Sequence, residues 1–377
     1  MQIAHLFQRQ RSFVKKTAPN RSTSLDSMVW KRFCRNKLAV ISLVVICCFA
    51  VMALLGYVIT PDSTPHCNQQ YLEIATLKPM SKVDFTYINE GQNPEHHSWV
   101  HKMLYGEPLP YTAIPTWSRT DRGDSLDVEC YTGSTPNDGE IRRVAKSEVV
   151  RYETRTFILG TDSYGRDVLS MMMIGSRVSL SVGFIAIAIA LLIGITLGAI
   201  AAYFGGWVDN LIVWFINVVW SIPTVLLVIA ITFALGKGFW QVFVAVGLTM
   251  WVDIARVVRG QVLSFKEKEF VEAGRALGFS TFRIIFRHIL PNITGAIIVV
   301  AASNFASAIL LEAGLSFLGI GVQPPMVSWG SLVKENYGYI LLDNAQLAFI
   351  PGLAIMVVVL AFMLLGNGIR DALDIKN

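Results

Sequence analysis

The sequence contains little charge and none of the common catalytic signatures. Lys, Arg, Asp and Glu make up 16% of its 377 residues, whereas hydrophobic residues make up 53%. Ordinary soluble domains carry about 25% charge. A G-x-x-x-x-G-K-[ST] phosphate loop, HExxH, CxxC and G-x-S-x-G are all missing from the sequence. The sequence therefore predicts a protein that is not an enzyme, has no ATP site of its own and has lipid as its main solvent.

Metal, cofactor and nucleic-acid sites are not predicted either. His96, His97 and His101 have no thiolate or carboxylate at ligand spacing, which favours surface histidines of a polar loop over a metal site. The net charge of +5 is not arranged as a basic stripe with interleaved aromatic residues. We expect no metal, no cofactor and no nucleic-acid partner.

Six apolar runs approach or exceed the length of about 20 residues that a bilayer requires. They are 38–59, 178–204, 211–235, 239–252, 293–320 and 347–366, and the fourth is short. The first run differs from a cleaved signal peptide, because the segment before it and its apolar core are both too long and no A-x-A site follows. We expect an all-α polytopic membrane protein with six transmembrane helices.

Basic residues predict the orientation of these helices. Residues 1–37 contain nine Lys/Arg against one acid, Asp26, and an excess of this kind marks the cytoplasmic side. Counting spans then places 60–176 and 321–346 outside and the segment 253–288, with seven Lys/Arg, inside. Both termini are predicted to be cytoplasmic.

The chain divides into four parts. These are a basic tail (1–37), the first transmembrane helix (38–60), an extracytoplasmic insert (61–158) and a five-span core (159–377) that contains a cytoplasmic loop (265–291). The insert is rich in turn signals and includes the β-branched and aromatic stretches VDFTYI and SEVVRYETRTFIL. We expect it to form a small β-rich or α+β subdomain.

The five cysteines suggest one covalent link. Cys34, Cys47 and Cys48 lie in or beside the first apolar run, where they fit as small packing residues. Cys67 and Cys130 are the only two in the predicted external insert, and an oxidising compartment would favour a disulfide between them. Whether the geometry allows that bond is left open by the sequence.

The cytoplasmic loop predicts two short helices around a tight corner. FKEKEFVEAGRALG, at 265–278, is rich in strong helix formers. Gly278 offers a left-handed end to that helix, and Ser280 or Thr281 can cap the next. Two interpretations remain, an amphipathic helix on the membrane surface and a protrusion that meets a soluble partner. The corner favours the protrusion, because a helix lying on the membrane gains nothing from a sharp turn.

The second of these helices is predicted to be amphipathic. Its apolar face would carry Phe282, Ile285, Phe286 and Ile289, at the spacing of one helical stripe. Arg283 and Arg287 would lie on the other face, and Pro291 suits the first turn of the next span.

The stretch EAGRALGFSTFRIIFRHILPN, at 272–292, resembles the E-A-A-x-x-x-G…L-P loop of permease subunits of binding-protein-dependent ABC importers. Alanine is usual at Gly274, and a glycine within a helix costs roughly 0.5–1 kcal/mol. The docking helix is therefore expected to form fully only when docked. The residues matching the head of the motif are Glu272, Ala273, Gly274 and Gly278, those matching its tail are Leu290 and Pro291, and Arg275, Arg283 and Arg287 lie between them.

Further motifs resemble the C-type permeases of dipeptide, oligopeptide and nickel importers. They are LGTDSYGRDVLS (159–170), GSRVSLSVG (175–183), YFGGWVDN (203–210), WSIPTVLL (220–227) and EAGLSFLGIGVQPPMVSWG (312–330). The similarity covers 159–373. Met171, Met172 and the long insert depart from the family pattern.

The resemblance implies the ABC importer permease fold in a bacterial inner membrane, with the 265–291 loop docked on a cytoplasmic ATPase. The implied partners are a second, homologous permease, two ABC ATPase subunits that bind the ATP, an external solute-binding protein and membrane lipid. The motifs favour peptides over nickel as cargo. Two other classes fit less well. A stand-alone secondary transporter would show inverted repeats and intramembrane acid–base pairs, and a membrane-anchored sensor would need only one span.

Three further features are candidates for the transport pathway. Pro223 is expected to kink the third span, either in a static bundle or as a bending point. Glu312 is the only acid well inside a predicted span, where a charge costs about 2.5–3.5 kcal/mol. Either it pairs with Arg177 or a partner permease, or it gates the pathway, and both are favoured over substrate contact. Asn304, Ser303 and Ser307 either line a pathway or hydrogen-bond across helices.

A short helix is also predicted outside the membrane. Thr161 or Asp162 would cap it, and Arg166 and Asp167 would keep it at the membrane interface.

Overall fold

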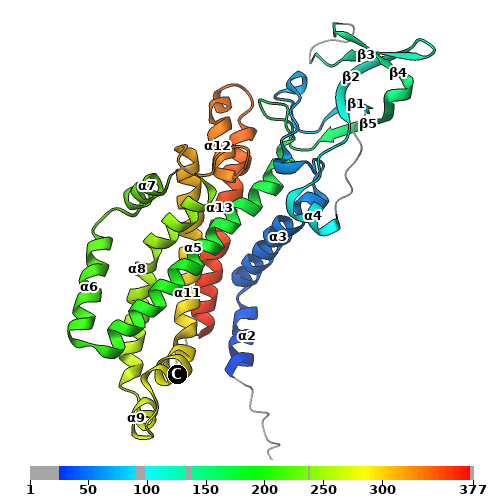
Figure 1. The fold of residues 1–377 in the computed structure, drawn as a ribbon. Helices are drawn as coiled ribbons and strands as arrows, with labels where there is room; N and C mark the ends of the chain where they lie inside the picture. Colours follow the sequence, from blue (N-terminus) through cyan, green and yellow to red (C-terminus); the bar gives the residue numbers. More distant parts are fainter. Residues whose placement is uncertain (1–24, 90–97, 133–137, 237, 374–377) are drawn as a thin grey trace, which may run out of the picture.

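The computed structural model describes residues 25–89, 98–132, 138–236 and 238–373, which form a helical bundle with a β-sheet beyond one end (Figure 1). The predicted histidines His96 and His97 and most of the basic tail lie outside the described residues. We call the end of the bundle that carries the sheet the sheet end, and the opposite end, where α9 (Glu269–Ala276) lies, the loop end. The helix α2 (Leu25–Arg35) and the last described residues of the chain, which end at Leu373, lie at the loop end.

Five helices in the described part of the chain are long and apolar enough to cross a membrane, and a bent pair provides up to one more. The five are α3 (Lys37–Ile59), α5 (Val168–Phe204), α8 (Phe239–Lys266), the continuous helix Thr281–Phe317 and α13 (Gln346–Leu373). The bent pair is α6 (Gly206–Trp220) and α7 (Thr224–Leu235). The predicted helical membrane fold is confirmed, but several boundaries differ.

The predicted third span, 211–235, is wrong as a single helix. α6 and α7 meet at an angle of 91° around Pro223. Proline has no amide hydrogen to donate and disfavours helical backbone in the residue before it. Pro223 adopts φ −53° and ψ 124°, outside the helical region, so the chain turns sharply where a kink was expected.

α5 begins earlier than predicted, at Val168 instead of 178. Arg177, which directly precedes the predicted start, lies within this helix. The Arg177 guanidinium donates to the backbone carbonyls of Ala53 at 2.9 Å, Leu54 at 3.0 Å and Leu104 at 2.7 Å. It thereby ties α5 to the end of α3 and to the short helix α4 (Trp99–Tyr105). These hydrogen bonds replace those that the Arg177 guanidinium would form with water.

α8 runs to Lys266, well past the predicted end at 252. Two of its charged residues contact α6. Arg259 forms a two-pronged ion pair with Asp209, each bond 2.6 Å long, and Arg256 lies 3.6 Å from the ring centre of Trp220. Hydropathy therefore predicts too short a helix here, because the last turns of α8 contain charged residues that contact α6.

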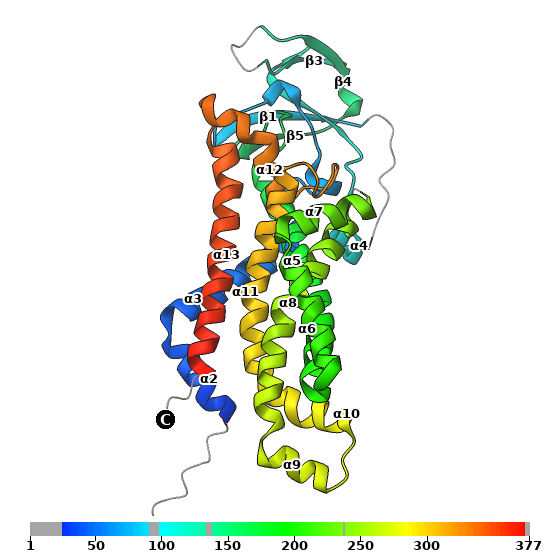
Figure 2. The same cartoon turned by 90° about the vertical axis from the view of Figure 1, so that its left-hand side faces the viewer.

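Close backbone packing joins α5 to α8. A Cβ added at Gly194 would lie 2.7 Å from the Trp251 carbonyl oxygen, and one at Gly198 would lie 2.5 Å from the Ala255 carbonyl oxygen. Small residues four apart allow membrane helices to approach in this way. α11 (Leu290–Phe317) packs against α5, α8 and α13, and α3 packs against α5 and α13 (Figure 2).

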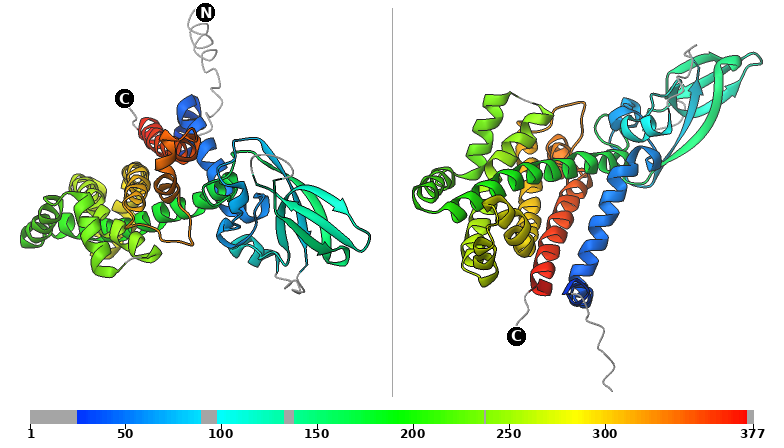
Figure 3. Two further views of the ribbon diagram at one scale, coloured as in Figure 1. Left: turned by 90° about the horizontal axis from the view of Figure 1, so that it is seen from above. Right: turned by 60° about the horizontal axis from the view of Figure 1, so that its bottom comes forward.

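The insert is a five-stranded antiparallel sheet, which confirms the prediction of a small β-rich subdomain. The strands, in sheet order, are β4 (Ile141–Ala145), β3 (Ser125–Cys130), β2 (Thr112–Asp121), β1 (Ser81–Ile88) and β5 (Val149–Phe157). Two small apolar clusters stabilise it, one around Phe85 and Tyr87 and one around Leu126 and Val128. Figure 3 shows the sheet lying to one side of the helices.

The predicted Cys67–Cys130 disulfide is not formed in this structure, where both are free thiols. Cys67 belongs to the main core of the bundle, and its thiol lies 3.1 Å from the Asp62 carbonyl oxygen. Cys130 ends β3 and packs with the second sheet cluster. The two thiols therefore belong to different cores.

We expect alkylation to report two free thiols of different reactivity. Burial raises the pKa of the Cys67 thiol, which is fully buried, so a maleimide should label Cys67 only after denaturation, and Cys130 before it. The measurement is mass spectrometry of protein isolated without reductant, with Cys67→Ala to assign the peptide. If both thiols label only after reduction, the free-thiol prediction is wrong and the two cysteines form a disulfide.

Candidate functional site

The loop between α8 and α11 protrudes from the loop end and has the predicted corner. α9 (Glu269–Ala276) ends in two backbone bonds, from the Gly278 amide to the Arg275 carbonyl (2.9 Å) and from the Phe279 amide to the Gly274 carbonyl (3.0 Å). This pair of bonds is a Schellman motif, which requires a left-handed residue after the helix. Gly278 provides it, with φ +75°. The corner at Gly278 is confirmed.

Gly274 does not leave α9 incomplete, contrary to the expectation that the helix forms fully only when docked. The residue is buried in a continuous helix, and a Cβ added there would meet the Phe279 ring at 3.4 Å. Phe279 also stacks on His288, at 5.5 Å between ring centres, and carries the Arg283 guanidinium 4.1 Å above its ring. A Cβ at that distance makes an ordinary van der Waals contact, so the corner closed by the aromatic ring would also admit an alanine at position 274.

The second helix of the loop is continuous with α11, so the prediction of two separate short helices is wrong. Ser280 caps it by accepting the Arg283 amide (3.3 Å), as predicted. The chain then passes through α10 (Thr281–Arg283) and a π-helical segment, η4 (Ile284–Ile289), into α11. A π-helical turn shifts the hydrogen-bond register, which lets a helix accommodate a proline such as Pro291. The side-chain amide of Asn292 donates a hydrogen bond to the His288 carbonyl at 2.6 Å.

The predicted apolar face of this helix is divided. Ile285 and Ile289 are buried with Ile284, as the stripe requires, but Phe282 and Phe286 are exposed. Their rings lie 4.3 Å apart on the outside of the loop. Because the π-helical segment begins at Ile284, the faces before and after it no longer align as in a regular α-helix.

An uncovered docking surface results at the loop end, which we define as Phe270, Glu272, Ala273, Arg275, Leu277, Phe282, Phe286 and Arg287, all exposed. Leu277 is 73% exposed and Phe282 69%. Contiguous exposed apolar residues rimmed by charge are typical of protein–protein contact sites. Of the predicted residues, Glu272, Ala273, Arg275 and Arg287 are exposed on this surface. Gly278 forms the corner, Arg283 covers Phe279, and Pro291 lies in the first turn of α11.

Gly278→Val should open the corner. A β-branched residue in the left-handed region costs about 1–2 kcal/mol, although no atom lies within 4 Å of an added Cβ at Gly278. We expect faster amide hydrogen exchange across 269–290 with unchanged exchange in α13. Gly338→Val is the matched control, because its added Cβ also meets nothing within 4 Å and its φ is not left-handed. Equal exchange in the two variants would contradict the role of the left-handed turn.

The predicted external helix at Asp162 is not formed. Residues 161–167 make a tight turn instead, in which the Asp162 carboxylate accepts the amides of Tyr164 (2.9 Å) and Arg166 (2.8 Å). Asp167 is not an interface residue but caps α5, accepting the Ser170 amide at 2.9 Å. Burial raises the pKa of Asp167, and the bonds from Ser170 offset part of that rise. The local side-chain bonds to backbone amides compete successfully with a helix.

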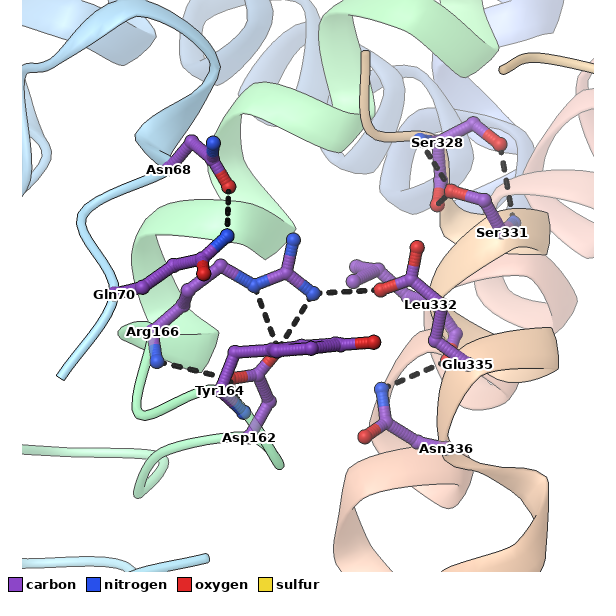
Figure 4. Close-up of polar contacts among 10 residues, drawn as sticks. All are labelled: Asn68, Gln70, Asp162, Tyr164, Arg166, Ser328, Ser331, Leu332, Glu335 and Asn336. Atoms are coloured by element: carbon purple, nitrogen blue, oxygen red, sulfur yellow. Dashed lines mark hydrogen bonds and ion pairs between the residues drawn. The ribbon is translucent and has the colours of Figure 1, made fainter. Parts of the chain in front are cut away.

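Arg166 joins this turn to α12 (Trp329–Asn336), as Figure 4 shows. Its guanidinium donates to Asp162 (2.7 Å from Nε) and to Glu335 (2.6 Å from Nη2). Burial alone would lower the pKa of Arg166, but the two carboxylates outweigh it and hold the pKa above its ordinary value. The predicted interface residues thus form a buried ion network at the sheet end.

Glu312 is fully buried and does not pair with Arg177, contrary to one of the two structural alternatives. Its carboxyl group accepts from Ser179 of α5 (3.1 Å) and Ser316 of α11 (2.7 Å). Ser179 also accepts the Trp329 amide, 3.3 Å away, at the start of α12. Serine hydroxyls, in place of a cation, hold Glu312 where three helices meet.

The pathway candidates separate in the structure. Asn304 is buried and donates to the Met250 carbonyl of α8 at 3.3 Å, so it acts between helices. Ser307 lines a cavity of about 310 Å³ beside the break at Pro223. The same cavity is lined by Asp253, which the sequence analysis missed because the predicted fourth span ended at 252.

These features define a class, a polytopic membrane protein with an exposed loop of apolar and charged residues at one end and a cavity beside a broken helix pair. The family described as "Binding-protein-dependent transport system inner membrane component" matches residues 194–376, and "N-terminal TM domain of oligopeptide transport permease C" matches residues 24–79. The chain belongs to this family of ABC importer permease subunits, multi-pass proteins of the inner membrane.

Several characterised proteins are similar to this chain. The dipeptide transport system permease protein DppC of Lactococcus lactis is 32% identical over 347 residues, 92% of this chain and 89% of that protein. The protein of the same name from Alkalihalophilus pseudofirmus is 43% identical over 217 residues (58% and 71%). The glutathione transport system permease protein GsiD of Pectobacterium atrosepticum is 41% identical over 218 residues (58% and 72%).

One solved structure that matches part of this chain is described as an inward-facing conformation of the MetNI methionine ABC transporter. It is 19% identical, covers 54% of this chain and 96% of the matched chain, and has a TM-score of 0.46.

Proposed function

We propose that this chain is one of two permease subunits of an ATP-driven importer of di- or oligopeptides. The observation that carries the proposal is the uncovered docking surface at the loop end of a bundle whose family is that of binding-protein-dependent permeases. The names of its relatives specify dipeptide, oligopeptide and glutathione transport, which supports peptides over nickel.

The proposed assembly contains a second, homologous permease, two cytoplasmic ABC ATPase subunits and an extracytoplasmic solute-binding protein. ATP is bound by the ATPase subunits, and this chain needs no cofactor and catalyses no reaction. Closure of the ATPases moves the docking surface, which shifts the bundle between inward-facing and outward-facing states, and hydrolysis resets it.

The proposed orientation places the loop end and both termini in the cytoplasm. Basic residues gather at that end, including Lys268, Arg275, Arg283 and Arg287 of the loop and Arg370 near the end of α13. Short loops with excess Lys and Arg remain inside. In a variant without native cysteines, a membrane-impermeant maleimide should label Tyr152→Cys in intact spheroplasts and Leu277→Cys only after permeabilisation. The reverse pattern would overturn the orientation.

Transport itself is tested in proteoliposomes that contain the whole complex. We expect ATP-dependent uptake of labelled dialanine or of a pentapeptide, and none without the ATPase subunits or the binding protein. Nickel uptake without peptide uptake would replace the proposed cargo. Peptide uptake that needs only this chain and an ion gradient would establish the alternative of a secondary transporter.

A further inference from the structure

A cavity with both apolar and polar lining residues lies at the break between α6 and α7. It has a volume of about 310 Å³ and is enclosed by the α6–α7 turn, the middle of α8 and the middle of α11. Ligand pockets begin at about 300 Å³. Its polar side chains are Trp220, Thr224, Thr249, Asp253 and Ser307.

Asp253 is the acid of this cavity. It lies at the middle of α8, a helix that crosses the membrane, and its side chain is exposed to the cavity. Within the described part of the chain, its carboxylate has no hydrogen-bond or ion-pair partner, unlike Asp209 on α6, which binds Arg259. A membrane acid that faces a cavity without a partner is by default a functional residue.

The hydroxyl groups beside Asp253 are arranged as acceptors. Thr249 donates its proton to the Val246 carbonyl of its own helix (2.8 Å), and Ser307 donates to the Ser303 carbonyl (3.3 Å). Each oxygen then has only lone pairs left for a ligand. A carboxylate flanked by two such oxygens fits a cation with several hydrogen-bond donors, and an ammonium group has three.

We propose that Asp253, with Thr249 and Ser307, binds the α-ammonium group of the peptide during its passage through the membrane. This inference rests on the proposed peptide import. Peptides of different sequence share only their backbone and termini, so a site for the α-ammonium group serves them all. Binding there is expected to be transient, because the site offers the ammonium group a single charge pair.

The first test compares Asp253→Asn with Asp253→Glu in the full complex in proteoliposomes. Asparagine keeps the shape and removes the charge, whereas glutamate keeps the charge. We expect dialanine uptake to fall roughly tenfold or more in Asp253→Asn, as befits a lost charge-assisted hydrogen bond, and to recover largely in Asp253→Glu. Asp343→Asn is the control for loss of one negative charge, since Asp343 is an exposed residue at the sheet end.

The second test identifies the group that Asp253 binds. N-lactoylalanine replaces the α-ammonium group of dialanine by a hydroxyl, and uptake of both is compared at measured, equal occupancy of the binding protein. Wild type should favour dialanine, and Asp253→Asn should transport the two at similar rates. An equal loss for both compounds would overturn the assignment.

Two other outcomes also overturn it. If Asp253→Asn takes up dialanine at the wild-type rate, the carboxylate is not used. If Asp253→Asn no longer co-purifies with the second permease, Asp253 pairs across the subunit interface instead. Failure of the proposed function is distinguishable, because the wild-type complex would then transport neither compound.

Discussion

Glu272→Lys should lower ATP-dependent uptake at least about tenfold while the chain still inserts and folds. Glu272 is exposed on α9 at the docking surface and has no salt bridge in the described structure. Reversing a charge at an interface places like charges together, which costs several kcal/mol. Within the bundle the substitution disturbs little, because the side chain does not pack against the core.

The measurement is uptake and ATPase activity of the same proteoliposomes, with co-purification of the ATPase subunits. Glu267→Lys is the matched control, an exposed acid that precedes α9 and lies outside the docking surface. Glu272→Gln should have a smaller effect than Glu272→Lys. Full uptake by Glu272→Lys would refute docking at this surface.

Arg166→Met should destabilise the sheet end by about 3–5 kcal/mol, the usual cost of leaving a buried charge without its partner. The side chain of Asp162 is 1% exposed and that of Arg166 8%, whereas Glu335 is 30% exposed. Glu335→Gln should therefore cost much less, since its amide oxygen still accepts a bond and water reaches the site. Arg166→Lys should fall between them, because an ammonium group lacks the fork that reaches both carboxylates.

Thermal unfolding in detergent provides the ranking, with intrinsic tryptophan fluorescence as the signal. Trp329 contributes to that signal from beside the site, because it is fully buried at the start of α12 and donates to the Met172 carbonyl at 3.0 Å. Equal midpoints for Arg166→Met and Glu335→Gln would contradict the proposed importance of the buried Asp162.

Hydropathy predicted most of the helices because lipid imposes a simple requirement on long apolar runs. It failed where tertiary contacts satisfy polar groups. α5 can include Arg177 because carbonyls of α3 accept hydrogen bonds from its guanidinium group. α8 can include Asp253 because a cavity lies beside that side chain. Such partners are distant in sequence, so no local pattern reveals them.

The docking loop was more predictable than the rest of the site. Gly278 and Ser280 determine local geometry through their own backbone and side chain, and both behaved as expected. The π-helical segment was not predicted, because it depends on how the helix packs after the corner. Pro223 indicated a break but not its 91° angle, which depends on the helices around α6 and α7. The pairing of Arg166 with Glu335 spans 169 residues and has no local signal.

The continuity of Thr281–Phe317 has a mechanical consequence. A helix of 37 residues is about 56 Å long, so a tilt of about 10° around its midpoint moves each end by roughly 5 Å. Phe282 lies at one end of this lever, on the docking surface, and Glu312 lies near the other, among the serines of α5 and α11. When this continuous helix tilts as a unit, Phe282 and Glu312 are displaced in opposite directions.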